Sequence, residues 1–129
     1  MSAPTRPGDV PHSAALARVA HLYSHHVLAL VEHRHGLDAL TPEMVAEHAV
    51  VALAYGAALT ERIESGRWSI AADALAAGAG LERTAEAMGW DRLTMRVGLG
   101  QWASEQHRLG LIDTERYEQV VSPLWEDPS

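Results

Sequence analysis

The chain has 129 residues, of which 47% are hydrophobic, and a formal net charge of −7. This length suits one domain with a core of its own, and the apolar fraction excludes a disordered chain. The sequence has no cysteine, which excludes a disulfide framework and a thiolate zinc site.

The first eleven residues contain three prolines and a glycine, so we expect residues 1–11 to be a flexible tail without regular structure. They include one arginine and no apolar segment, unlike a secretory signal. The longest apolar run, residues 49–59, is shorter than the roughly 20 residues of a membrane span. We therefore predict a cytoplasmic chain with no membrane partner.

Residues 12–129 are predicted to form a single all-α domain, which opens with a helical hairpin over residues 12–66. Its first helix should run from Ser13 to Arg34, and its second from Thr41, an N-cap before Pro42, to Ser65–Gly66. The first helix has apolar residues at helical spacing, which should form its buried stripe: Leu16, Val19, Tyr23, Val27 and Leu30. The second is apolar on every side over residues 49–59, so we expect a homodimer interface there, with the central helix of a monomeric bundle as the alternative.

A tri-helical unit should follow over residues 67–112. A short helix at about residues 69–77 precedes the stretch LERTAEAMGWDRLTMRVGLGQWASEQHRL, residues 81–109. There, a first helix should end at Gly89, and Asp91 should cap a second helix that buries Leu109 and ends before Gly110. Residues 113–129 complete the predicted domain with a short helix, Thr114 to Val121, capped by Asp113, and an acidic tail.

The spacing of Ala85, Gly89, Trp90 and Met95 resembles the helix-turn-helix superfamily of bacterial, actinobacterial-type DNA-binding proteins. The resemblance covers residues 81–109 only. It implies a small regulator of transcription or of a mobile element that binds double-stranded DNA as a homodimer, with the helix at residues 91–109 in the major groove.

One face of that helix carries the side chains that a major-groove reader needs. Arg92 and Arg96 lie one turn apart near its N-terminus and suit guanine, while Arg83 and Arg108 are expected on phosphates. The predicted DNA-binding residues are Arg83, Arg92, Arg96, Gly100, His107 and Arg108, and Ala103 shares their face. Residues 81–112 are nevertheless neutral overall, so the alternative is a protein-interaction or adaptor module with the same helical fold and no DNA binding.

Metal binding and catalysis have little support in the sequence. Among eight histidines, His21 and His25 lie four residues apart on one helical face and are the candidates for metal ligands, but no HExxH pattern accompanies them. The chain also lacks a nucleophile motif and a phosphate-binding loop. We expect no metal, no cofactor and no enzymatic activity.

Overall fold

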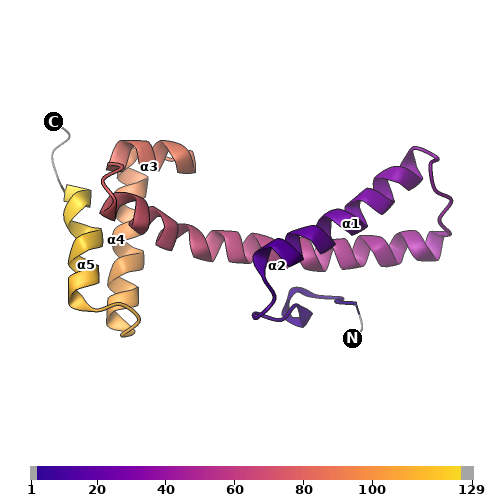
Figure 1. Ribbon diagram of the computed structural model, residues 1–129, viewed down its shortest axis with the longest axis horizontal. Helices are drawn as coiled ribbons and strands as arrows, with labels where there is room; N and C mark the ends of the chain where they lie inside the picture. Colours follow the sequence, from indigo (N-terminus) through magenta and orange to yellow (C-terminus); the bar gives the residue numbers. More distant parts are fainter. Residues whose placement is uncertain (1–2, 126–129) are drawn as a thin grey trace. The chain divides into compact units, whose positions relative to one another are not determined.

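The computed structural model describes residues 3–125, and every regular element in that range is helical (Figure 1). The α-helices are α1 (Leu16–Arg34), α2 (Pro42–Ala76), α3 (Leu81–Met88), α4 (Arg92–Arg108) and α5 (Thr114–Val121). Two short 3-10 helices, η1 (Pro7–Asp9) and η2 (Ser122–Trp125), complete the set. The predicted all-α fold class is confirmed, and the last four residues of the predicted acidic tail lie outside the described residues.

Contacts between residues divide the chain into two compact units, Met1–Ser65 (unit 1) and Gly66–Ser129 (unit 2). The boundary lies inside α2, which belongs to unit 1 over residues 42–65 and to unit 2 over residues 66–76. The predicted hairpin and the predicted tri-helical unit meet one residue from this boundary.

The helix break predicted at Ser65–Gly66 is wrong, because α2 continues through both residues. Gly66 does not adopt a positive φ, and the Ser65 hydroxyl donates to the carbonyl of Arg62, as it does inside a helix. A single helical glycine costs only about 1 kcal/mol relative to alanine, which the hydrogen bonds of the surrounding turns outweigh. The helix ends instead near Gly78, where φ is +92°.

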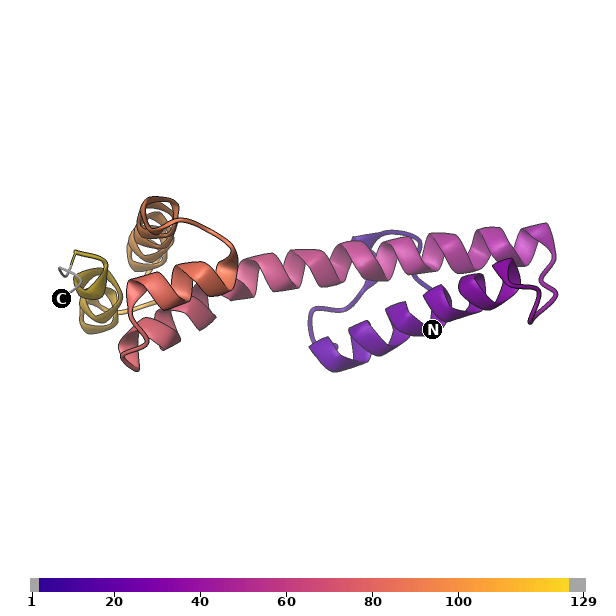
Figure 2. The ribbon, with the colours of Figure 1, turned by 90° about the horizontal axis from the view of Figure 1, so that it is seen from above.

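In unit 1, α1 and the first part of α2 run antiparallel as a hairpin (Figures 1 and 2). Thr41 caps α2 as predicted, since its hydroxyl accepts a hydrogen bond from the Met44 backbone N–H at 3.2 Å. The core of the unit is small: Val19, Ala58 and Val10 are buried together. The predicted stripe of α1 is therefore buried at Val19, whereas Leu16 and Tyr23 remain exposed.

The segment before α1 packs against this hairpin, so the prediction of a tail without regular structure is wrong for residues 7–10. Residues 7–9 form η1, and Val10 is only 5% exposed. The guanidinium of Arg62 donates to the backbone carbonyls of Pro11 and Ala14. A buried valine and an arginine that satisfies two carbonyls hold the segment despite its prolines.

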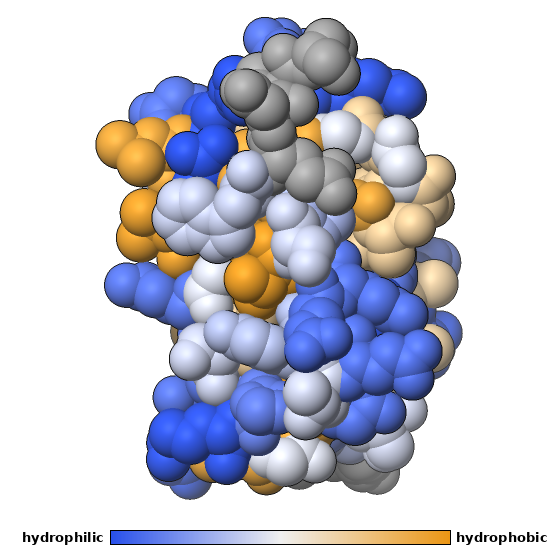
Figure 3. Space-filling view, turned by 90° about the vertical axis from the view of Figure 1, so that its left-hand side faces the viewer, coloured by the Kyte–Doolittle hydropathy of each residue, from blue (hydrophilic) through white to orange (hydrophobic). Residues whose placement is uncertain are grey.

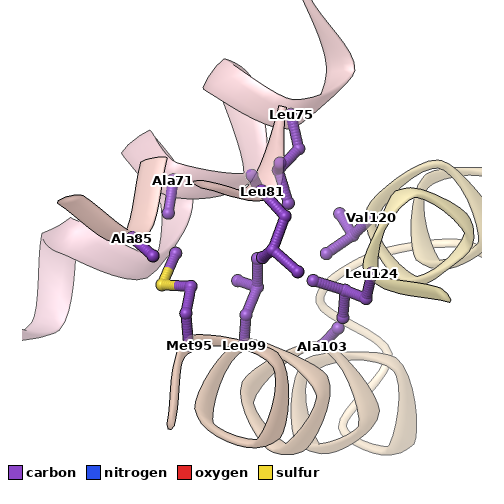
Figure 4. Packing of buried hydrophobic residues seen from close by; sticks show 10 residues of the cluster. Ala71, Leu75, Leu81, Ala85, Met95, Leu99, Ala103, Val120 and Leu124 are labelled. Atoms are coloured by element: carbon purple, nitrogen blue, oxygen red, sulfur yellow. The ribbon is translucent and has the colours of Figure 1, made fainter. Parts of the chain in front are cut away.

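In unit 2, side chains from α2, α3, α4, α5 and η2 converge on one core (Figure 4). Met95, Leu99 and Ala103 of α4 are fully buried there against Val120 of α5 and Leu124 of η2. Small residues at the end of α2 and in α3 allow these helices to approach α4 closely: Ala71, Ala72 and Ala85. This core fixes which face of α4 is covered.

The turn between α3 and α4 has the local geometry that the sequence predicts. Gly89 adopts φ +73°, a conformation that disfavours a Cβ, and Trp90 donates its backbone N–H to the Ala85 carbonyl. The Asp91 carboxylate accepts from the Thr94 backbone N–H at 2.7 Å, which lowers the pKa of Asp91. Beyond α4, Leu109 is exposed, so its predicted burial is wrong.

Candidate interaction surface

The α4 face predicted to read DNA is partly covered by the C-terminal elements. Ala103 on that face is 0% exposed. The Arg96 Nε donates to the Leu124 carbonyl at 2.6 Å, and its guanidinium lies 5.1 Å from the centroid of the Trp125 ring. η2 thus covers part of the face that was predicted to meet a DNA groove, at Arg96 and Ala103.

Gly100 and His107 of α4 both lie near the segment that follows this helix, and His107 is exposed. A Cβ added at Gly100 would be 3.8 Å from Leu124 Cδ1. The His107 ring stacks on Tyr117 of α5 with centroids 4.9 Å apart, and its Nε2 is 3.1 Å from the Thr114 hydroxyl. Both predicted contact residues thus serve the packing of α4 against the segment that follows it.

The remaining predicted cations differ in their surroundings. Arg108 forms an ion pair with Glu105 at 2.5 Å, and its hydrogen bonds lower the pKa of that carboxyl group. Arg92 is half-buried, and its Nε has no hydrogen-bond partner among the described residues. Arg83 is exposed on α3. The structure does not bring the predicted arginines together as one solvent-facing set on α4.

The open side of α4 is apolar instead. Leu93 is 66% exposed and Val97 is 50% exposed. They line a groove of about 400 Å³ whose walls include no charged side chain, which we call the tryptophan groove: Trp68, Trp90, Leu93, Thr94, Val97, Gly98 and Gln101. On the face that Figure 3 shows, hydrophobic side chains reach the surface among hydrophilic ones.

The two tryptophans of this groove are placed by a glycine. Their ring centroids are 5.2 Å apart, and a Cβ added at Gly98 would lie 2.5 Å from Trp68 Cη2. Gly98 therefore lets the Trp68 ring lie directly on α4. No sequence pattern connects these two positions, because Trp68 and Gly98 are 30 residues apart and meet only through the fold.

A second apolar groove runs along the hairpin of unit 1, with a volume of about 710 Å³. We call it the hairpin groove, and its walls come from α1 and from residues 49–63 of α2. Leu53 is 73% exposed and Ile63 is 54% exposed on it. Gly56 brings the Tyr23 ring close to α2, since an added Cβ would be 2.9 Å from Tyr23 Cε2.

Two histidines of unit 1, His26 and His48, form a pair that the sequence did not predict. Nδ1 of His26 lies 2.9 Å from Nδ1 of His48 on the other helix. Burial, followed by the charges of His25 and His48, lowers the pKa of His26. His21 and His25 are exposed, and residues 3–125 contain no cluster of three or more potential metal-ligating side chains.

These features define an all-α protein with two helical units, each with an apolar groove at its surface. Comparisons with protein-family models, with curated proteins and with solved structures find no match to this chain. In the described part of the chain, no helix combines the length and apolar character needed to cross a bilayer.

Proposed function

We propose that the chain is a homodimeric protein-interaction module that presents the tryptophan groove to a polypeptide partner. The exposure of Leu93 and Val97, on the helix side that faces solvent, carries this proposal. Contacts to phosphates and bases depend on cationic and hydrogen-bonding side chains. No charged side chain among the described residues lines the tryptophan groove. Tryptophan is enriched in protein-binding hot spots, and exposed apolar patches rimmed by polar residues mark interaction sites.

The homodimer part of the proposal is supported by the hairpin groove. Among the described residues of unit 1, α1 and α2 are the only long helices. No third long helix of this unit covers Leu53 and Ile63, as a monomeric bundle would require. A second hairpin packed on the groove would give a four-helix arrangement and remove these side chains from water.

Site-directed photo-crosslinking tests the partner surface. We expect a crosslinking amino acid at position 97, in the full chain expressed in its parent cells, to give a discrete protein adduct that Leu93→Asp abolishes. The same label at Ser104, which is exposed elsewhere on α4, is the matched control. Equal adducts from both positions, or none from either, would refute the assignment of this groove.

Sedimentation equilibrium tests the dimer. Leu53→Glu places a charge in the hairpin groove and should convert a dimer into a monomer. Leu28→Glu is the matched control, because Leu28 is also exposed but does not line the groove. A wild-type monomer at all concentrations would contradict the homodimer, and so would dissociation by Leu28→Glu alone.

DNA binding is a second candidate, favoured by the helix–turn–helix geometry around Gly89 and Asp91. It would have to use Arg83, which is exposed, and parts of α4 other than its covered face. Fluorescence anisotropy with duplexes from the upstream region of the protein's own gene, at low salt, distinguishes the candidates. Saturable binding that Arg83→Gln weakens and salt abolishes would favour DNA, and we expect no such binding.

A further inference from the structure

A trough lies between the end of α2 and α3, entirely within unit 2, and it differs from the tryptophan groove in its charges. Its volume is about 360 Å³, at the lower end of the roughly 300–1,000 Å³ of small-molecule sites. Ala74, Ala87 and Met88 contribute to an apolar lining. Arg67 and Arg83 also line it, and no acidic side chain does.

The walls of the trough combine small alanine side chains with the larger Ile70 and Met88. Ala71 and Ala85 are buried in the core of unit 2. Ala74 and Ala87 do not fill the space beside these residues. The result is an apolar channel that is open to solvent along the surface of unit 2.

Arg67 is held in place by aromatic rings rather than by a carboxylate. Its guanidinium carbon lies 4.6 Å from the Trp90 centroid and 5.2 Å from the Trp68 centroid. The Arg67 Nε is buried without a hydrogen-bond partner among the described residues. Stacking on a ring leaves the in-plane N–H groups of a guanidinium free to donate, so the cation is oriented in advance for an anionic ligand.

Arg83 supplies a second positive charge from α3. In residues 3–125 neither Arg67 nor Arg83 takes part in an ion pair. Two cations beside an apolar channel complement a ligand that is both anionic and hydrocarbon-like.

We propose that this trough binds a small apolar carboxylate, such as a medium-chain fatty acid. The hydrocarbon tail lies along the alanine-rich lining, where its burial drives binding. The carboxylate accepts charge-assisted hydrogen bonds from Arg67 and Arg83. The trough and the tryptophan groove have different lining residues, and Arg67 of the trough lies over Trp68 and Trp90 of the groove.

Titration of the full-length, isotope-labelled protein with decanoate, followed by amide NMR, tests the site. We expect saturable shifts centred on Ala74, Ala79 and Ala87, with decanol binding at least about tenfold more weakly because it lacks the charge. Arg83→Gln should weaken decanoate binding by about tenfold. Arg116→Gln is the control, because Arg116 pairs with Asp73 and does not line the trough.

Ala87→Leu tests the channel itself. Ala87 is exposed, so the variant should fold, and its larger side chain should fill the channel and remove decanoate binding. The inference is overturned if decanol binds as tightly as decanoate. It is also overturned if decanoate binding survives Ala87→Leu, or if Arg83→Gln and Arg116→Gln have the same effect.

Discussion

Two glycines of α4, Gly98 and Gly100, lie two residues apart and should respond to alanine in opposite ways. Inside a helix, a Gly→Ala change stabilises the folded state by about 1 kcal/mol, because alanine has the higher intrinsic helix propensity. At Gly100 the new Cβ would meet Leu124 Cδ1 at 3.8 Å, an ordinary contact, so the variant should be about 0.5–1 kcal/mol more stable than wild type.

At Gly98 the new Cβ would lie 2.5 Å from Trp68 Cη2. The ring cannot yield freely, because it packs against Trp90 and beneath Arg67. Overpacking of this kind costs about 1–3 kcal/mol, which exceeds the helix-propensity gain in most of that range. Since the two effects oppose each other, we expect Gly98→Ala to be less stable than wild type by up to about 2 kcal/mol.

Urea unfolding followed by circular dichroism at equal protein concentration measures both variants, and tryptophan emission reports the displaced Trp68 ring. Gly66→Ala provides a further control, since nothing lies within 4 Å of its added Cβ. If Gly98→Ala proved as stable as Gly100→Ala, with unchanged emission, then Trp68 would not lie on α4 and the tryptophan groove would be wrong.

Three further outcomes follow from the contacts. Asp113→Ala should cost about 1 kcal/mol, because the carboxylate caps α5 by accepting the Arg116 backbone N–H at 2.7 Å; thermal unfolding checks this, and an unchanged midpoint would contradict the cap. Burial first, and then neighbouring histidines, lower the pKa of His26 below its ordinary value of 6.5. The unfolded chain therefore binds a proton at this histidine more readily than the folded chain. The free energy of unfolding should be highest above pH 6.5 and should decrease as the pH falls below it; a His26→Gln variant with the same pH profile would show that His26 is not the cause. Arg96→Gln should lower the free energy of unfolding by about 1.5–3 kcal/mol, because it removes a charged donor from the Leu124 carbonyl; a side chain that served DNA alone would leave stability unchanged.

The parts of the fold that were predictable are those set by a few neighbouring residues. Gly89, Asp91, Thr41 and Asp113 mark helix ends by local hydrogen bonds and by one backbone conformation, and the structure places those ends within a residue or two of the predictions. These signals depend on interactions within about four residues, so the helix ends that they mark do not depend on how distant segments pack.

The continuation of α2 through Gly66 shows where local signals fail. A Ser–Gly pair resembles a helix end, but a glycine ends a helix only when it adopts the left-handed conformation, as Gly78, Gly89 and Gly110 do in positive φ. Residues on both sides of Gly66 favour the helix, and the small intrinsic cost of one glycine does not reverse that preference. The outcome depends on the whole segment rather than on the pair.

The face of α4 was harder to assign than its ends. A helical projection places Arg92, Arg96, Gly100 and Ala103 on one side, but it does not say whether that side meets solvent or protein. The answer depends on α5 and η2, which bury Val120 and Leu124 against α4. The other side of α4, which includes Leu93 and Val97, is therefore exposed to solvent. Its side chains are more apolar than those of the arginine-bearing side.

The arginines show why a cation in a sequence is not by itself a DNA contact. Several arginines already donate hydrogen bonds to backbone carbonyls or carboxylates of this chain: Arg62, Arg96, Arg108 and Arg116. An arginine that satisfies a carbonyl at a helix end or loop contributes to stability and is not available to a phosphate without breaking that bond. Arg67 and Arg83 have no such acceptor among the described residues, and both line the α2–α3 trough. Arg92 also has no acceptor at its Nε within residues 3–125, but Arg67 and Arg83 share one apolar channel, and this pairing favours a small anionic ligand there over a long phosphate backbone.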